Sequence, residues 1–111
     1  MKRKYRLRRN SDFQRVRQVG KSYASPIMVL AFLRNELEYS RFGFVVSKRL
    51  GKAVIRNKIK RRIREATRLK MSQIKPGFDI VLIARNRINQ ASYLEVSQSL
   101  EHLLKAADLL V

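Results

Sequence analysis

Apolar residues recur at helical spacing in three stretches of the chain. A spacing of three or four positions places apolar side chains on one face of a helix, and that face can then be buried. The pattern predicts a first helix over residues 11–19, a long second helix over residues 54–71 and a last helix that starts at Ser92. Ser92 and Glu95 form a capping-box pattern, in which each side chain binds a free backbone N–H group at the helix start.

The same pattern predicts how the helices end and which faces they bury. Ser11 and Gln14 form a second capping box, and Gly20 suits the left-handed conformation just past a helix end. The expected inner face of the second helix comprises Ile55, Ile59, Ile63, Ala66 and Leu69. The expected inner face of the last helix comprises Tyr93, Val96, Leu100, Leu103, Leu104 and Ala107.

Three shorter apolar runs predict β-strands. Residues 27–33 and 42–47 flank a polar stretch, so we expect them to pair as a hairpin. Gly43, inside the second run, indicates a bulge or the close approach of another group. Residues 78–84 are almost continuously apolar, as in strands buried on both faces, and a helix separates them from the second run. We therefore expect this third strand to lie parallel to one of the earlier strands.

Length and composition indicate one domain of the α+β class. The chain has 111 residues, of which 45% are hydrophobic, enough for a single modest core. We expect one domain over residues 1–111, with helices packed on a small mixed sheet in the order helix, strand, strand, helix, strand, helix. The first ten residues are strongly basic and are expected to be extended or flexible.

The composition also excludes several classes of protein. Because the chain has no cysteine, it has no disulfide, no thiolate nucleophile and no cysteine-containing zinc site. No apolar run reaches the roughly 18 residues that a membrane span needs, and no apolar segment follows the basic N-terminus as in a secretory signal. We expect a cytoplasmic protein that has no membrane partner.

A formal net charge of +18 indicates a polyanionic partner. The charge is concentrated in the N-terminal segment and in residues 48–70, where Lys and Arg fill the arc of the second helix opposite its apolar face. A merely solvated helix face typically mixes both signs, because ion pairs add stability. A membrane-surface helix needs its apolar face free, whereas this one is needed for the core. The arc therefore favours nucleic acid, whose phosphates the planar guanidinium group can bind with two hydrogen bonds.

The chain shows no set of side chains suited to catalysis. Its carboxylates are scattered over different elements, whereas a two-metal nuclease needs carboxylates that converge. The single histidine, His102, is not accompanied by a second histidine or a carboxylate cluster. We expect no catalytic residue, no metal ligand and no cofactor bound by the protein itself. Since the basic helix offers few groups that read base edges, a structured RNA recognised by shape is favoured over DNA.

Residues 48–65, KRLGKAVIRNKIKRRIRE, resemble the signature of the bacterial ribonuclease P protein component. In that family a Lys/Arg-rich turn with glycine leads into an Ala-Val-x-Arg-Asn-x-x-Lys-Arg-x-x-Arg-Glu run. Residues 8–13 and residues 78–85 (FDIVLIAR) are similar to two other parts of the family, its lead into Asp-Phe and its buried strand, so the likeness covers nearly the whole chain. The residues that match the signature are Ala53, Val54, Arg56, Asn57, Lys60, Arg61, Arg64 and Glu65.

The resemblance implies an α/β sandwich with an unusual left-handed parallel crossover. It also implies the protein subunit of ribonuclease P, an endoribonuclease that removes the 5′ leader from precursor tRNA. In this family catalysis resides in the RNA with bound magnesium, while the protein binds that RNA and holds the leader. The implied partners are the ribonuclease P RNA and precursor tRNA, without an obligate protein partner, and the protein alone is expected to be non-catalytic.

The resemblance also implies two sets of site residues. In some relatives an aromatic residue stands where this chain has Arg17, and in others where it has Ala31, so the stacking surface of the leader cleft is expected to be reduced or shifted. The implied residues of this cleft are Phe13, Arg17, Ala31 or Phe32, and Val45 or Ser47. The implied RNA-binding residues are Lys48, Arg49, Lys52, Arg56, Asn57, Lys60, Arg61, Arg64 and Arg68.

Two other functions fit parts of the sequence. A ribosomal protein or a general RNA chaperone would also carry a cationic helix. An autonomous protein nuclease would also bind RNA, but the scattered carboxylates disfavour it. For Phe13, which lies beside basic residues, a core position and a stacking platform for a single-stranded base fit equally well.

Overall fold

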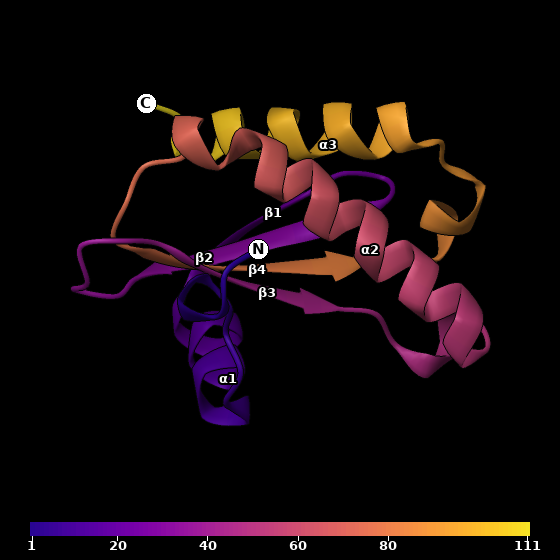
Figure 1. Ribbon diagram of the computed structural model, residues 1–111, viewed down its shortest axis with the longest axis horizontal. Coiled ribbons are helices and arrows are strands. Elements are labelled where there is room, and N and C mark those ends of the chain that lie inside the picture. The colour runs from indigo at the N-terminus through magenta and orange to yellow at the C-terminus, as the bar shows by residue number, and fades with distance from the viewer.

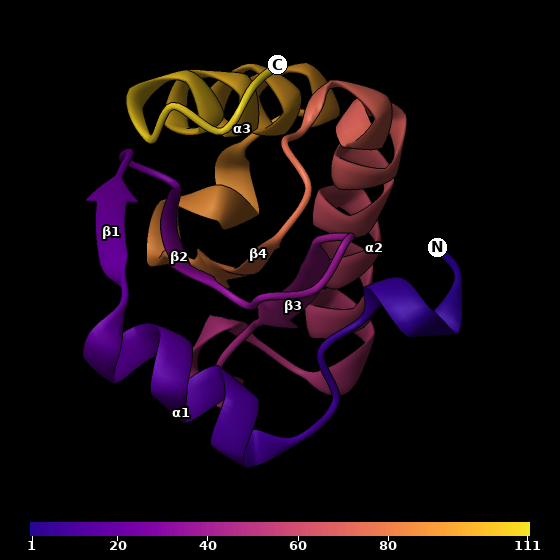
Figure 2. The same ribbon diagram turned by 90° about the vertical axis from the view of Figure 1, so that its left-hand side faces the viewer.

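Three helices cover the two faces of a four-stranded sheet (Figure 1). The computed structural model of the protein describes all 111 residues. Figure 2 shows that two helices lie together on one face of the sheet and that the first helix lies on the other. The helices are α1 (Asn10–Val19), α2 (Ala53–Lys70) and α3 (Tyr93–Ala106). The strands are β1 (Lys21–Ala24), β2 (Met28–Arg34), β3 (Arg41–Val45) and β4 (Phe78–Ala84).

The expected α+β class is confirmed, but the strand order differs from the predicted one. The strands lie in the order β1-β2-β4-β3, with β2 antiparallel to both of its neighbours and β3 parallel to β4. Parallel pairing of the third predicted strand is therefore confirmed. The hairpin predicted between residues 27–33 and 42–47 is wrong, because β4 lies between those strands. β4 suits the central place because Ile80, Val81 and Leu82 are all fully buried.

The connection from β2 to β3 shows how β4 comes to lie between them. The backbone N–H of Asn35 donates to the carbonyl of Gly77 (3.0 Å). The Ser40 hydroxyl donates to the carbonyl of Lys75 (2.7 Å) and accepts from the backbone N–H of Phe78 (3.0 Å). The loop is thus bound to the segment that leads into β4, and it does not close a tight turn between β2 and β3.

β1 is a strand that the apolar pattern did not reveal. All of its residues are exposed, so no alternation of apolar and polar positions marks it. It pairs with β2 at the edge of the sheet, and Ala24 lies opposite Val29. The turn between them is held by the Ser25 hydroxyl, which accepts from the backbone N–H groups of Ile27 (3.3 Å) and Met28 (3.2 Å).

The connection from β3 through α2 to β4 is left-handed. In Figure 1 the arrows of β3 and β4 point the same way, and Figure 2 looks along these strands as they recede from the viewer. There the chain passes from β3 up to α2 and then across to β4 on the left, which is an anticlockwise path. Nearly all parallel crossovers are right-handed. The connection therefore has the unusual hand that the family resemblance implies.

Two hydrophobic cores lie on opposite faces of the sheet. Successive side chains of a strand point to opposite faces of the sheet. Leu82 of β4 therefore lies in the larger core under α2 and α3, whereas its neighbour Val81 lies in the smaller core. Burying one such side chain contributes about 1.5–3 kcal/mol to the stability of the fold. Because β4 has buried side chains in both cores, it holds the helices of both layers on one sheet. The smaller core, beneath α1, consists of Leu7, Val16, Ala31 and Val81.

The inner faces predicted for α2 and α3 are wrong at the helix ends. The middle of the α2 face is buried, but Ile55 and Leu69 are 44% and 57% exposed. The N-terminal end of α2, which carries Ile55, projects past the sheet (Figure 1). Thr67 is buried instead, and its hydroxyl donates to the carbonyl of Ile63 (2.8 Å). In α3 the first residue of the predicted face, Tyr93, is 38% exposed, while the others are buried. No helix combines the length and the apolar character that a membrane crossing requires.

The two predicted capping boxes have different outcomes. The one at α3 is confirmed, because Ser92 Oγ accepts from Glu95 N and Glu95 Oε1 accepts from Ser92 N, both at 3.1 Å. The one at α1 is wrong. That helix starts one residue earlier than predicted, its N-cap is Arg9 and no side chain caps it, so Ser11 lies within the first turn.

Two glycines are required by close contacts. Gly20 is extended (φ −74°, ψ 174°), so the predicted left-handed conformation is wrong. A Cβ at Gly20 would overlap the main-chain carbonyl of Phe32. A Cβ at Gly43 would overlap the ring of Phe13, which confirms the close approach expected at that glycine.

The N-terminal segment lies along the free edge of β3. Arg6 forms a parallel β-bridge with Phe42, and the backbone N–H of Leu7 donates to the carbonyl of Phe42 (2.8 Å). Leu7 is buried in the smaller core. The segment is extended here, as expected, but residues Arg3–Tyr5 form a short 3-10 helical turn, so the extended conformation expected for the whole segment is wrong there. The flexibility expected of residues 1–10 stays a prediction.

Replacing Gly20 by alanine should destabilise the protein more than replacing Gly43. The new methyl group at Gly20 meets main-chain atoms of β2, whereas at Gly43 it meets the end of the Phe13 side chain, which can swing aside. We expect the free energy of unfolding, measured with urea, to fall by about 3 kcal/mol for Gly20→Ala and by about 1 kcal/mol for Gly43→Ala. A loss at Gly20 equal to or smaller than that at Gly43 would contradict this ranking.

Candidate nucleic-acid interface

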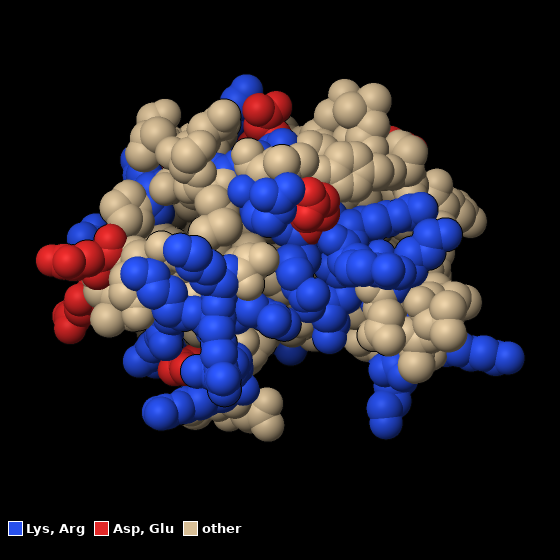
Figure 3. Space-filling model, in the orientation of Figure 1, with Lys and Arg blue, Asp and Glu red and all other residues tan.

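Lys and Arg side chains crowd one face of the molecule, over α2 and the N-terminal segment (Figure 3). The burial of Ile59 and Ile63 against the core turns the opposite side of α2 outward. The predicted RNA-binding residues therefore lie together on this helix and on the turn that leads into it. Lys48 and Arg49 belong to that turn (Lys48–Leu50), and Lys52 is the N-cap of α2. The others project from the helix itself: Arg56, Asn57, Lys60, Arg61, Arg64 and Arg68.

Most of these cations lack a carboxylate partner within the protein. Arg68 is the exception, because its Nη2 and Nε atoms bind Glu65 at 2.6 and 3.0 Å. That hydrogen bonding lowers the pKa of Glu65 and raises the pKa of Arg68. No salt bridge involves the remaining Arg and Lys residues of α2. Their charge is left for an external anion.

Two guanidinium groups on α2 have buried nitrogen atoms without a partner. The Nε atoms of Arg56 and Arg64 are inaccessible to solvent and make no hydrogen bond. Burial lowers the pKa of Arg64, and the nearby charge of Arg6 lowers it further. Leaving a charged donor unsatisfied is costly, and a phosphate bound beside Arg64 and Arg6 would relieve the repulsion between these two guanidinium groups.

The start of α2 adds to the positive potential of this face. The helix has no side-chain cap and no acidic residue in its first turn. Its first backbone N–H groups therefore remain free, and the helix dipole places a partial positive charge at the same end. Lys48, Arg49 and Lys52 surround this end.

A cleft of about 430 Å³ opens between α1, the end of β3 and α2. Phe13, Arg17 and Val45 line it, as the family resemblance implies. Asn10 and Gln14 also line it and lie on the same face of α1 as Phe13 and Arg17. The helical spacing of positions 10, 13, 14 and 17 could have identified both residues from the sequence. Phe44 and Val46 also line the cleft and were not predicted from the sequence, and Lys60, which was predicted only for the RNA-binding helix, lines it too.

The remaining residues implied for the cleft do not line it. Ala31 faces α1 but is only 3% exposed within the smaller core. Phe32 points to the opposite face of the sheet, where it packs against the larger core. Ser47 lies beyond the end of β3 and is not part of the cleft wall. Ala31 and Phe32 differ because neighbouring side chains of a strand point to opposite faces of the sheet.

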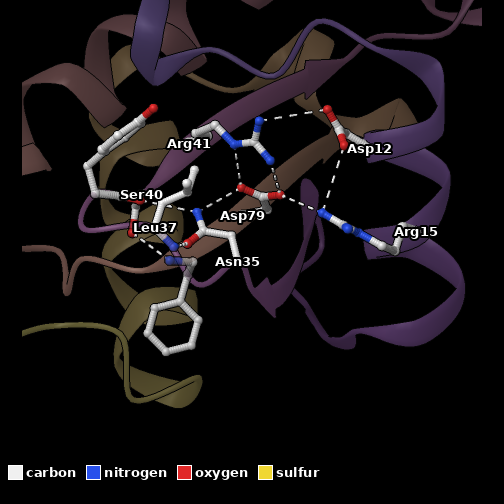
Figure 4. A network of polar contacts seen from close by, with 9 residues as sticks. Asp12, Arg15, Asn35, Leu37, Ser40, Arg41 and Asp79 are labelled. Carbon is white, nitrogen blue, oxygen red and sulfur yellow. Dashed lines mark hydrogen bonds and ion pairs between the residues drawn. The ribbon is translucent and has the colours of Figure 1, made fainter.

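A buried carboxylate near the start of β4 connects α1 to the sheet (Figure 4). The side chain of Asp79 is 1% exposed and accepts two hydrogen bonds from Arg41, at 2.7 and 2.9 Å. It accepts others from Asn35 (3.0 Å) and from Arg15 of α1 (3.4 Å), which lies 3.8 Å from Asp12. The hydrogen bond with Asp79 raises the pKa of Arg41, in spite of the opposing effect of burial. The network therefore holds the helix that carries Phe13 and Arg17.

The hydrophobic pattern of the sequence does not reveal this network. A signal was present, because Asp79 is a charged residue inside the apolar run 78–84. A charge in a strand buried on both faces needs a partner. The sequence could not show which of the many arginines would be that partner.

Comparison with known proteins decides what this interface belongs to. The sequence matches the family model described as ribonuclease P over residues 1–108. The ribonuclease P protein component of Alkaliphilus oremlandii is 42% identical over 105 residues, which cover 95% of this chain and 92% of that protein. This chain belongs to the ribonuclease P protein family. The RNase P protein of Staphylococcus aureus has a similar solved structure, with a TM-score of 0.89 at 42% identity over 96% of this chain and 98% of that one. The RNase P protein from Thermotoga maritima gives a TM-score of 0.84 at 39% identity over 91% of this chain and 96% of that one.

Membership of the ribonuclease P protein family settles the function predicted from sequence. A ribonuclease P protein component is part of the ribonuclease P holoenzyme, an endoribonuclease, and works with ribonuclease P RNA. The family confirms tRNA processing and RNA binding over the two alternatives, a ribosomal or chaperone protein and an autonomous nuclease.

Removing the Asp79 carboxylate should destabilise the protein strongly. Asp79→Ala leaves the Arg41 guanidinium without its main partner, and breaking a buried pair in this way costs about 3 kcal/mol. Urea unfolding measures the loss. Glu65→Ala removes one carboxylate from an exposed ion pair and serves as the matched control, for which we expect no measurable change. Equal losses in the two variants would contradict the role assigned to Asp79.

Proposed function

We propose that α2 and the preceding turn bind ribonuclease P RNA, while the cleft beside α1 binds the 5′ leader of precursor tRNA. The holoenzyme then cuts the precursor at the leader junction. In this proposal the RNA and its bound magnesium carry out the cleavage, and the protein supplies positive charge and a surface for the leader. The absence of a converging carboxylate set in the sequence supports this division of labour.

The single observation that carries the proposal is the uncompensated charge of α2. Arg56, Lys60, Arg61 and Arg64 share one helix face and make no ion pair within the protein. Guanidinium groups held by a helix that is itself packed on a core form a rigid array. Such an array favours a folded RNA, whose phosphates keep fixed positions.

The composition of the cleft favours a single strand of RNA. An aromatic ring, Phe13, lies beside two cations, Arg17 and Lys60. Single-stranded nucleic acid binds to surfaces in which bases stack on rings and phosphates meet cations. Lys60 also lines a depression on α2 with Asn57 and Arg61, so the cleft is continuous with the basic face of the helix. The leader and the catalytic RNA would thus lie on adjoining surfaces.

Two further parts of the proposal extend beyond the protein surface. Magnesium is expected to be bound by the RNA, which addition of magnesium to the RNA with and without protein would test. The cytoplasmic location expected from the sequence stays a prediction, which cell fractionation would test.

Reconstitution tests the proposed function directly. The protein is mixed with a bacterial ribonuclease P RNA and a precursor tRNA at low magnesium concentration. We expect cleavage at the leader junction only when protein and RNA are both present. Cleavage by the protein alone would support an autonomous nuclease, and no stimulation of the RNA would support a general RNA-binding protein.

Removing one cation from α2 should weaken binding of ribonuclease P RNA. For Arg61→Ala we expect an affinity roughly tenfold lower and a salt dependence reduced by about one unit of slope, because about one phosphate contact is lost. Filter binding over a range of salt concentrations measures both quantities. Lys105→Ala, an equal change of charge in the last turn of α3, is the control and should bind as the unaltered protein does. Equal effects of the two substitutions would show that net charge alone drives binding.

Replacing the ring of Phe13 should affect the leader and spare the RNA. Phe13→Leu keeps an apolar side chain beside the smaller core but removes the flat face. We expect the holoenzyme to bind precursor tRNA about tenfold more weakly, with no change for tRNA that lacks a leader or for ribonuclease P RNA. Equal weakening for substrates with and without a leader would place the leader elsewhere.

A further inference from the structure

A second groove lies on the flank of α2 that faces the start of α3. It has a volume of about 390 Å³, within the range of roughly 300–1,000 Å³ typical of sites for small ligands. Its position differs from that of the leader cleft, because the two share no residue. The residues that line it are Lys58, Arg61, Arg62, Glu65 and Tyr93.

Tyr93 is an aromatic residue of the groove that is not buried in the core. The helical pattern predicts it on the inner face of α3, yet 38% of it is exposed and its ring lines the groove. Val96, one turn further along, is buried, so the helix itself is well seated on the core. Tyr93 is therefore accessible at the start of α3, beside the cations that line the groove. Aromatic rings next to cations are the composition of sites that stack unpaired bases.

The charges around the ring favour a phosphate group. Lys58, Arg61 and Arg62 line the groove, and Glu65 contributes its only carboxylate. Both oxygens of Glu65 are bound to Arg68, at 2.6 and 3.0 Å, and that pairing lowers the pKa of Glu65. The carboxylate is thus ionised but already neutralised by a neighbour. The lysine and the arginines of the groove make no ion pair of their own.

A hydrogen bond connects Arg62, which lines the groove on the α2 side, to the backbone just before α3. Nη1 of Arg62 donates to the carbonyl of Ala91 (3.2 Å), a buried residue just before α3. This hydrogen bond links α2 to the chain immediately ahead of Tyr93. The two elements that form the groove are therefore joined at its edge, and the guanidinium group of Arg62 has a partner within the protein.

We propose that this groove binds one unpaired nucleotide of RNA. The base stacks on Tyr93, and the phosphate group binds Arg61 and Lys58. An acidic peptide would satisfy the cations but would not need the flat ring, so the ring favours a nucleotide. The proposal rests on the proposed function in one respect, since ribonuclease P RNA or precursor tRNA supplies the nucleotide. It adds a second contact, on the flank of α2 away from the leader cleft.

Substitutions of Tyr93 test the stacking contact. Tyr93→Leu should lower RNA affinity about tenfold with an unchanged salt slope, because a stacking surface is lost and no charge is removed. Tyr93→Phe keeps the ring and should bind normally. Leu94→Ala, which truncates the neighbouring 63% exposed side chain outside the groove, is the matched control and should also bind normally.

The two RNA partners are measured separately. A loss of affinity for ribonuclease P RNA assigns the nucleotide to that RNA. A loss seen only when the holoenzyme binds precursor tRNA assigns it to the substrate. If the unaltered protein binds both RNAs and Tyr93→Leu binds them equally well, the groove proposal is overturned and the proposed function stands. Failure of the unaltered protein to bind either RNA would instead overturn the proposed function.

A fluorescent reporter tests the stacking contact without the Tyr93→Leu substitution, which could loosen the packing of α3. The chain has no tryptophan, so Tyr93→Trp places a single indole in the groove. A base stacked on this ring should quench its fluorescence when RNA is added, whereas Leu94→Trp should change little. Absence of quenching at position 93 under conditions where the RNA is bound would also overturn the proposal.

Discussion

The burial of β4 on both faces is the constraint on which the rest of the molecule depends. Its alternating side chains enter two separate cores, one beneath α2 and α3 and one beneath α1. A helix on either side of the sheet therefore packs against the same strand, and the left-handed crossover brings α2 over the edge formed by β3. The leader cleft is the space between these two layers at that edge. Its shape follows from strand alternation and not from any one side chain in it.

Electrostatic repulsion and hydrophobic packing act on the same helix in opposite directions. The buried face of α2 holds the helix on the sheet, while its outer face gathers cations of which only Arg68 pairs with a carboxylate of the protein. Packing alone keeps those charges together, because nothing else in the free protein would favour their proximity. An RNA partner removes this repulsion, so the energy that opposes the compact free protein becomes part of the energy that favours the complex.

The few acidic residues have different structural roles, and position decides which. Asp79 is buried, binds Arg41 and accepts a hydrogen bond from Arg15 of α1, so it connects that helix to the sheet. Glu65 is exposed and pairs with Arg68 on its own helix, so it neutralises a cation at the border of the second groove. Asp79 and Glu65 each take their counter-charge from an arginine close by, and most of the cations of α2 are left free for phosphates.

The sequence by itself determined the three helices, the strands predicted at residues 27–33, 42–47 and 78–84, and the basic face of α2. These follow from local spacing, and local spacing needs no knowledge of distant neighbours. Only the tertiary structure decided that β4 lies between β2 and β3, that the polar β1 is a strand, and that Phe32 faces away from the cleft while Phe44 and Lys60 enter it. Each of these depends on contacts between residues far apart in the chain. The hydrophobic pattern records that a side chain is buried, and it does not record which neighbour buries it.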